Sequence, residues 1–220
     1  MDENGIILID KPAGMTSFGV VARVRRVLTQ QAGKKVKVGH TGTLDPFATG
    51  LMILVTGKEC KNAGHYTKLD KVYEATFRLG ETSTTGDPEG EVVAVSDRQP
   101  SLEEIKAALT KLTGEIEQRP PIFSAIKING RRAYTLARNG EEVEIPLRNV
   151  TVYSLELLEY AYPEVKVRTH VSSGTYIRSL CVDLGEALGT GAYCTHLRRI
   201  SISKWSVYDA KYLQEYGIEN

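Results

Sequence analysis

The sequence lacks the features that mark several large classes of protein. Its three cysteines, Cys60, Cys181 and Cys194, are an odd number with no close pair, so neither a disulfide framework nor a Cys-x-x-Cys zinc site is predicted. No apolar run approaches the roughly 20 residues of a membrane-spanning helix. The acidic start at residues 1–4 lacks the basic and apolar regions of a signal peptide. These absences predict a reduced, cytoplasmic protein without a membrane anchor.

Sequence motifs for nucleotides and metals are also missing. Residues 50–58 do not match a phosphate-binding loop, because six residues separate the two glycines and Glu59 follows the lysine. Gly189 and Gly191 are not followed by the third glycine of a dinucleotide fingerprint. The histidines show no ligand spacing to one another or to a cysteine (His40, His65, His170 and His196). We therefore expect no metal site.

Net charge is close to zero, at +1 over 220 residues, but the charges are segregated along the chain. Residues 1–40 carry seven Lys or Arg against three acids, and residues 119–148 carry six against three. Residues 81–104 carry seven acids and a single arginine. This pattern favours one basic and one acidic face, and a basic face suits phosphate binding. The near-neutral total is equally compatible with scattered solvated charges.

Hydrophobic periodicity predicts a mixture of strands and helices without regular strand–helix alternation, which is typical of the α+β class. Several expected strands alternate in polarity, which favours an antiparallel, half-exposed sheet. The expected strands are 5–9, 51–56, 72–79, 151–159, 164–171 and 200–207. The expected helices are one capped by Thr16 or Ser17 and ended by Gly33, one with a capping box at 101–104, a short one at 133–138, and one at 175–188.

One loop contains most of the residues that point to chemistry. Residues 39–50 hold three glycines, a proline, a histidine and one carboxylate, Asp45, directly before a buried apolar run. Such a composition indicates a shaped loop that presents a single reactive acid. The alternative is a turn in which Asp45 only hydrogen-bonds the local backbone, and the spacing alone favours neither interpretation.

Arg178 and two tyrosines also stand out. Arg178 falls in the first turn of its expected helix, where the helix dipole disfavours a cation by about 0.3–1 kcal/mol. It therefore has either an acidic partner or anionic ligand, or it is a snorkelling surface arginine. Tyr73 and Tyr176 occupy expected inner faces beside glycine-rich loops, a position typical of plain core and of a base-stacking platform. Phe123 and Tyr134, with basic neighbours, suit recognition of RNA loops.

Taken together and in order, the motifs resemble those of the TruB family of tRNA pseudouridine synthases over essentially the whole chain. They are Lys11-Pro12-x-Gly14-x-Thr16-Ser17, Gly39-His40-Thr41-Gly42-x-Leu44-Asp45-Pro46, Lys71-x-Tyr73-x-Ala75, Thr85-Gly86-Asp87, Gln118-x-Pro120-Pro121, Ser173-Gly174-Thr175-Tyr176-Ile177-Arg178 and Leu197-Arg198-Arg199. The resemblance implies a pseudouridine synthase fold, with a mixed, mainly antiparallel sheet flanked by helices. It also implies one catalytic domain over residues 1–220, in which residues 119–148 form a basic RNA-binding thumb insertion. The C-terminal PUA domain of many bacterial members is expected to be absent.

The resemblance further implies a reaction and a substrate. Uridine 55 in the T-loop of tRNA is flipped out and isomerised to pseudouridine, with no cofactor, by a monomer that binds the T-stem-loop. Asp45 would be the nucleophile or would stabilise a sugar intermediate, and Arg178 would be its partner. Tyr73 would stack on the flipped base and could remove a proton during the rearrangement.

The remaining residues carried over from the family have binding or supporting roles. His40 would fill space or bind RNA near the stack that the base vacates, and Tyr176 and Leu197 would line the uridine pocket. Lys11 and Pro12 would support the catalytic loop. Three alternatives stay open: a non-catalytic tRNA-binding folding helper, a synthase acting on ribosomal or guide-directed RNA, and a carboxylate hydrolase. The hydrolase is the weakest, because no second acid lies near Asp45 in the sequence.

Overall fold

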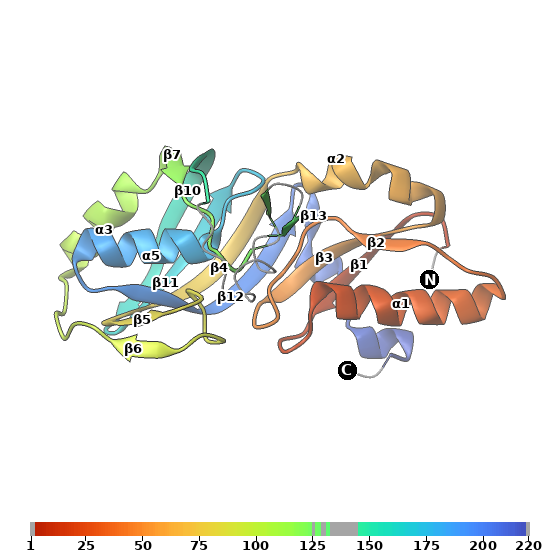
Figure 1. Ribbon diagram of the computed structural model, residues 1–220, viewed down its shortest axis with the longest axis horizontal. Helices are drawn as coiled ribbons and strands as arrows, with labels where there is room; N and C mark the ends of the chain where they lie inside the picture. Colours follow the sequence, from red (N-terminus) through yellow and green to blue (C-terminus); the bar gives the residue numbers. More distant parts are fainter. Residues whose placement is uncertain (1–2, 125, 129–130, 133–144, 219–220) are drawn as a thin grey trace. The chain divides into compact units, whose positions relative to one another are not determined.

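The computed structural model describes residues 3–124, 126–128, 131–132 and 145–218, and the chain divides into two compact units. Unit 1 comprises Met1–Tyr73 and Leu197–Asn220, and unit 2 comprises Glu74–His196 (Figure 1). Helices and strands are mixed and most strand pairs are antiparallel, so the predicted α+β class is confirmed. The predicted single catalytic domain spans both units and stays a prediction.

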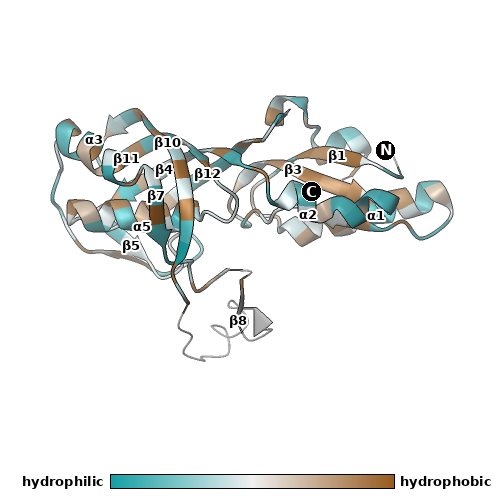
Figure 2. Cartoon of the chain, turned by 90° about the horizontal axis from the view of Figure 1, so that it is seen from above, coloured by the Kyte–Doolittle hydropathy of each residue, from teal (hydrophilic) through white to brown (hydrophobic). Residues whose placement is uncertain are grey.

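Unit 1 is built around a central strand, β3, which pairs antiparallel with β1 and β2 and parallel with the end of β12. Its strands are β1 (Ile6–Lys11), β2 (Val38–His40), β3 (Thr49–Thr56), the last part of β12 (Ala192–Ile202) and β13 (Trp205–Ser206). All but the first residue of β3 are buried, as expected for a strand covered on both faces. Its hydrophobic character is visible in Figure 2.

Helix α1 (Ser17–Ala32) packs beside these strands and follows the sequence signals closely. Thr16 is its N-cap and accepts a hydrogen bond from the Gly19 N–H at 2.9 Å. Gly33 ends the helix in the left-handed conformation. Unit 1 also contains short helices that the sequence did not indicate, namely η1 (Gly57–Asn62), α2 (Ala63–Thr67), η2 (Val207–Asp209) and η3 (Leu213–Tyr216).

Unit 2 combines a sheet in the order β4-β11-β10-β7 with two helices that pack against each other, and α3 also packs on β10. The elements are β4 (Lys71–Leu79), β7 (Gly114–Gln118), β10 (Arg148–Ala161), β11 (Glu164–Val171), α3 (Leu102–Lys111) and α5 (Ile177–Leu188). β4 shows the predicted alternation of buried and half-buried residues. Ser101 and Glu104 form the predicted capping box of α3.

Two hairpins complete unit 2, and neither was predicted from the sequence. β5 (Glu81–Ser83) pairs with β6 (Val92–Ala94), and β8 (Lys127–Ile128) pairs with β9 (Arg131–Arg132). The second hairpin lies within the predicted thumb, residues 119–148. The short helix predicted at residues 133–138 lies outside the described residues.

The predicted bounds of the last strand are wrong. β12 begins at Ala192, eight residues before the expected start, because Thr195, His196 and Arg198 interrupt the apolar pattern that would have marked it. It ends at Ile202, where Ser203 takes a positive φ of 48° and the chain turns into β13. α5 begins at Ile177, two residues later than expected, with Tyr176 as its N-cap.

Candidate active site

Asp45 lies in the loop that connects β2 to β3 in unit 1. It is half-buried, and its carbonyl accepts a hydrogen bond from the Ala48 N–H at 3.1 Å, which closes a tight turn. Ser17, the first residue of α1, donates through its hydroxyl to the Leu44 carbonyl and accepts from the Leu44 N–H, both at 2.8 Å. The residue before Asp45 is therefore tied to the start of α1.

Lys11 holds the other side of the same loop. Its side chain is fully buried at the end of β1, and its ammonium group donates to the carbonyls of Pro12 (2.8 Å), Met15 (2.7 Å) and Pro46 (3.1 Å). The Gly14 N–H also donates to the Pro46 carbonyl, at 2.8 Å. These contacts fit the supporting role that the resemblance implies for Lys11 and Pro12, since Pro46 directly follows the proposed catalytic aspartate.

Arg199 contacts the start of this loop, and sequence reasoning assigned it no role. The side chain on β12 is 1% exposed and donates from Nε to the Leu51 carbonyl at 2.7 Å and from Nη2 to the Gly42 carbonyl at 3.1 Å. A longer contact of 3.5 Å joins Nη1 to the Thr43 carbonyl. The only signal in the sequence is the Leu197-Arg198-Arg199 motif.

Lys71, at the start of β4, is a third buried cation in this part of unit 1, after Lys11 and Arg199. It donates to the carbonyls of Thr67, at 3.0 Å, and Leu69. Burial, with the nearby charge of Arg199, lowers the pKa of Lys71 to about 8. The amine is therefore close to its titration range at physiological pH.

Of the other predicted site residues of unit 1, His40 is half-buried, and Tyr73 and Leu197 are buried. His40 is the last residue of β2, opposite Leu54 of β3, so only four residues separate it from Asp45. Tyr73 lies on the buried face of β4, and Leu197 is buried on β12. Their predicted roles toward a uridine stay predictions.

Arg178, in unit 2, is the second residue of α5 and is buried, with only 4% of its surface exposed. Its Nη1 donates to Oδ2 of Asp87 at 3.0 Å and to the Thr85 carbonyl at 2.8 Å, and its Nη2 donates to the Phe123 carbonyl at 2.8 Å. The interpretation as a snorkelling surface arginine is wrong. The interpretation with an acidic partner is confirmed, and Asp87 supplies a carboxylate. The predicted pairing with Asp45 stays a prediction.

Asp87 is itself fixed by a dense set of contacts. Its Oδ1 accepts from the Thr85 hydroxyl at 2.6 Å and from the Glu89 N–H at 3.0 Å, while Oδ2 faces Arg178. The Gly86 carbonyl beside it accepts from the Cys194 N–H of β12 at 3.0 Å. Sequence reasoning recorded Asp87 as part of a motif but gave it no role.

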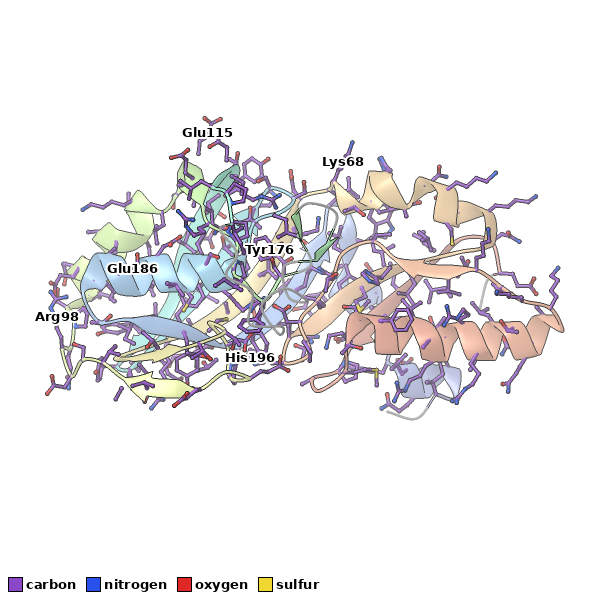
Figure 3. The ribbon with its side chains drawn as sticks, in the orientation of Figure 1. Lys68, Arg98, Glu115, Tyr176, Glu186 and His196 are labelled. Atoms are coloured by element: carbon purple, nitrogen blue, oxygen red, sulfur yellow. The ribbon has the colours of Figure 1, made fainter. Side chains whose placement is uncertain are left out.

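Tyr176 is the half-buried N-cap of α5 (Figure 3). The side chain of Gln118, at the end of β7, makes two hydrogen bonds to the backbone of Tyr176. Its Nε2 donates to the Tyr176 carbonyl at 3.0 Å, and its Oε1 accepts from the Tyr176 N–H at 2.7 Å. Gln118 is almost fully buried. The start of α5 is therefore anchored at both Tyr176 and Arg178.

Unit 1 offers a carboxylate, Asp45, on a loop whose backbone is held by Ser17, Lys11 and Arg199, together with the buried Tyr73. Unit 2 offers a buried guanidinium, Arg178, that is held by three contacts. No group of three or more His, Cys, Asp or Glu residues suited to a metal ion occurs in the described part of the chain. Likewise, none of the helices in that part is long and apolar enough to cross a membrane.

Comparison with known families and proteins identifies close relatives. The model described as "TruB family pseudouridylate synthase (N terminal domain)" matches residues 25–177, and that described as "tRNA pseudouridylate synthase B C-terminal domain" matches residues 178–215. The tRNA pseudouridine synthase B of Corynebacterium efficiens is 45% identical over 96% of this chain and 71% of its own length. The protein of the same name from Phocaeicola vulgatus is 43% identical over 97% of this chain and 92% of its own length.

Solved structures show the same fold. A crystal structure of a Cbf5-Nop10-Gar1 complex contains a chain with a TM-score of 0.74 and 29% identity. An H/ACA RNP bound to a substrate RNA containing 2'-deoxyuridine contains one with a TM-score of 0.70 and 27% identity. Each similarity covers 99% of this chain but 57% of the other, so this chain spans just over half the length of those proteins.

Proposed function

Because the chain belongs to the TruB family of pseudouridylate synthases, we propose that it converts uridine 55 in the T-loop of tRNA to pseudouridine. The observation that carries this proposal is the match of both family models across one chain, combined with a single ordered carboxylate, Asp45, in the loop before β3. The two curated relatives described above bear the name of this activity.

The reaction is an isomerisation, so the chain's own side chains must supply all of the chemistry. The bond from ribose C1′ to uracil N1 breaks, the base turns, and a bond from C1′ to C5 forms. N1 gains a proton and C5 loses one to solvent. Asp45 acts as a nucleophile on C1′ or on the uracil ring, or stabilises the sugar intermediate. No oxidant, reductant or hydrolytic water is consumed, so the proposed reaction needs no cofactor.

Arg178 and Tyr73 complete the proposed catalytic set. The guanidinium of Arg178 would orient the Asp45 carboxylate by charge-assisted hydrogen bonds. The contacts to Asp87, Thr85 and Phe123 described above hold the guanidinium in a fixed orientation at the start of α5. Tyr73 would stack on the uracil and accept the C5 proton.

The base must leave the stacked T-loop before it can react. Flipping costs a few kcal/mol, which stacking and pocket contacts offset. In the proposal Tyr176 and Leu197 line the pocket and His40 fills the space that the base vacates. Lys11 and Pro12 keep the loop in place.

The proposed RNA-binding surface combines the thumb, residues 119–148, with an unusually basic segment of unit 1. Residues 11–44 contain seven Lys or Arg and no acid. Arg26 on α1 and Lys34, Lys35 and Lys37 after it are exposed. We propose that these cations contact tRNA phosphates and that the enzyme works as a cytoplasmic monomer without a protein partner.

Release of tritium from tRNA labelled with [5-³H]uridine tests this function directly, because C5 loses its hydrogen only when the new bond forms. We expect the release of one tritium equivalent per unmodified transcript, and no release from a transcript that has cytidine at position 55. An isolated T-stem-loop should also react. Binding of both transcripts without release would instead favour the tRNA folding helper, and release that persists without uridine 55 would refute the assigned position.

A further inference from the structure

The loop that carries Asp45 is bracketed by two buried cations, and each of them contacts backbone carbonyls of the loop. Arg199 contacts the carbonyls of Gly42 and Thr43, before Asp45. Lys11 contacts the carbonyl of Pro46, directly after Asp45. Both side chains are at most 1% exposed. The aspartate therefore lies between two points where a buried charge holds the main chain.

The backbone of Arg199 is held in place as well as its side chain. In the parallel pairing of β12 with β3 it lies opposite Gly50, which has a φ of +105°. A Cβ at Gly50 would lie 2.3 Å from the Arg199 carbonyl oxygen and 2.7 Å from its nitrogen, so only glycine permits this approach. The backbone of Arg199 therefore packs closely on Gly50, just after the loop, while its side chain contacts the carbonyls of Gly42 and Thr43 near the start of the loop.

The shape of the guanidinium suits this task. A planar fork of fixed donors on three separate nitrogens can join Leu51 of β3 to Gly42 and Thr43 of the loop, whereas an ammonium group carries all of its donors on one nitrogen. A side chain at Gly42 would meet both Arg199 and Lys71 within 4 Å, so the guanidinium lies directly against the loop backbone.

We propose that Arg199 is a positioning residue of the isomerisation, which sets the place of Asp45 through the Gly42 and Thr43 carbonyls. This inference rests on the proposed function. It assigns Arg199 no contact with the substrate. The effect on rate comes from geometry, because a displacement of about 1 Å in a reacting group can reduce a rate about 10²-fold.

Arg199→Lys and Arg198→Lys form a matched pair on one strand. Arg198 points to the opposite face of β12, where it binds Asp10 through both carboxylate oxygens, at 3.0 and 2.6 Å. Each substitution keeps the charge and removes the guanidinium fork, which binds one carboxylate in the case of Arg198 and three backbone carbonyls in the case of Arg199. The measurements are the single-turnover rate of pseudouridine formation at saturating enzyme, the Kd for tRNA, the pH profile of the rate, and amide hydrogen exchange of residues 41–48.

We expect Arg199→Lys to lower the single-turnover rate about 10²-fold, with the tRNA Kd within about threefold of wild type. The acid limb of its pH profile should keep its midpoint, because the charge is retained. Exchange in residues 41–48 should be faster than in Arg198→Lys, whose rate should stay within about threefold of wild type. A wild-type rate for Arg199→Lys, equal losses in both variants, or a displaced acid limb would each overturn the proposal.

Two further readouts keep the outcome decisive. If Arg199→Lys does not fold, a backbone ester between Gly42 and Thr43 weakens the same carbonyl acceptor and leaves every side chain in place. That enzyme should react several-fold more slowly, and an unchanged rate would overturn the inference. Hydrogen exchange needs no catalysis, so a wild-type protein without synthase activity would refute the proposed function separately from the anchoring of the loop.

Discussion

The buried pair of Arg178 and Asp87 gives the sharpest prediction about stability. Both side chains are at most 4% exposed, and one oxygen of Asp87 contacts Arg178 at 3.0 Å. In Asp87→Asn the remaining oxygen can still accept hydrogen bonds from the Thr85 hydroxyl and the Glu89 N–H. The new NH₂ group, however, is a hydrogen-bond donor and lies opposite the N–H donor of Arg178. The substitution therefore replaces the ion pair with an unfavourable donor–donor contact and leaves the other contacts of Asp87 in place.

The expected cost follows from burial. Breaking a buried ion pair by neutralising one partner costs about 3–5 kcal/mol. Arg178 keeps the carbonyls of Thr85 and Phe123, which places the expected loss at the lower end, about 3 kcal/mol. With a urea m-value of about 2–3 kcal/mol/M, the unfolding midpoint should fall by about 1 M.

An exposed pair of the same type provides the control. Arg168 and Glu74 are 48% and 35% exposed, and neutralising Glu74 with Gln should cost less than about 1 kcal/mol. Urea titration followed by circular dichroism compares the two variants under one set of conditions. Equal midpoints for Asp87→Asn and Glu74→Gln would refute the argument that burial makes the Arg178 pair important.

Three further outcomes follow from the geometry, the titrating groups and the charges. Gly50→Ala should lower the free energy of unfolding by at least about 3 kcal/mol, because of its positive φ and the backbone clash with Arg199. Gly33→Ala, with φ +65° and no atom within 4 Å, should lower it by only about 1 kcal/mol in the same urea titration. Similar losses in the two variants would contradict the clash. Burial, with nearby Glu186, raises the pKa of Asp183 from 3.8 to about 6, so the folded state binds this proton more tightly and stability falls as pH rises from about 4 to 6. Asp183→Asn should therefore raise Tm by a few degrees at pH 7.5 and leave it unchanged at pH 3.5, and a Tm gain that is independent of pH would contradict this assignment. Binding of tRNA should weaken with salt at a log–log slope of about −0.7 to −0.9 per neutralised phosphate, and a slope near zero would remove the role given to the basic segments.

Local elements were predictable from the sequence because their signals are local. Helix α1 begins at a capping threonine, Thr16, and ends at Gly33, and both signals lie within a few residues of the backbone groups that they satisfy. Strand β4 was predicted from strict alternation. β12 was missed at its start because its polar and buried residues follow no simple period there, and the pairing partners that make it a strand are distant in the sequence.

The candidate site was predictable only in part, for the same reason. The shape of the loop around Asp45 is encoded in its glycines and proline. The unfavourable helix position of Arg178 allowed either an acidic partner or a snorkelling surface arginine, and the structure confirms the first. The identity of that partner was not accessible, because Asp87 lies 91 residues away in sequence. Arg199 was missed because it binds backbone carbonyls, which every residue has, so no residue type in the sequence indicates its partners.

The measurement that tests the central claim most directly is single-turnover tritium release from [5-³H]uridine-labelled tRNA by wild type and Asp45→Asn, each at saturating enzyme and with its tRNA Kd measured. The account predicts full release by wild type and no detectable release by Asp45→Asn, with similar Kd values. Release by Asp45→Asn at the wild-type rate, or binding without release by the wild-type protein, would contradict the claim that this chain is a pseudouridine synthase centred on Asp45.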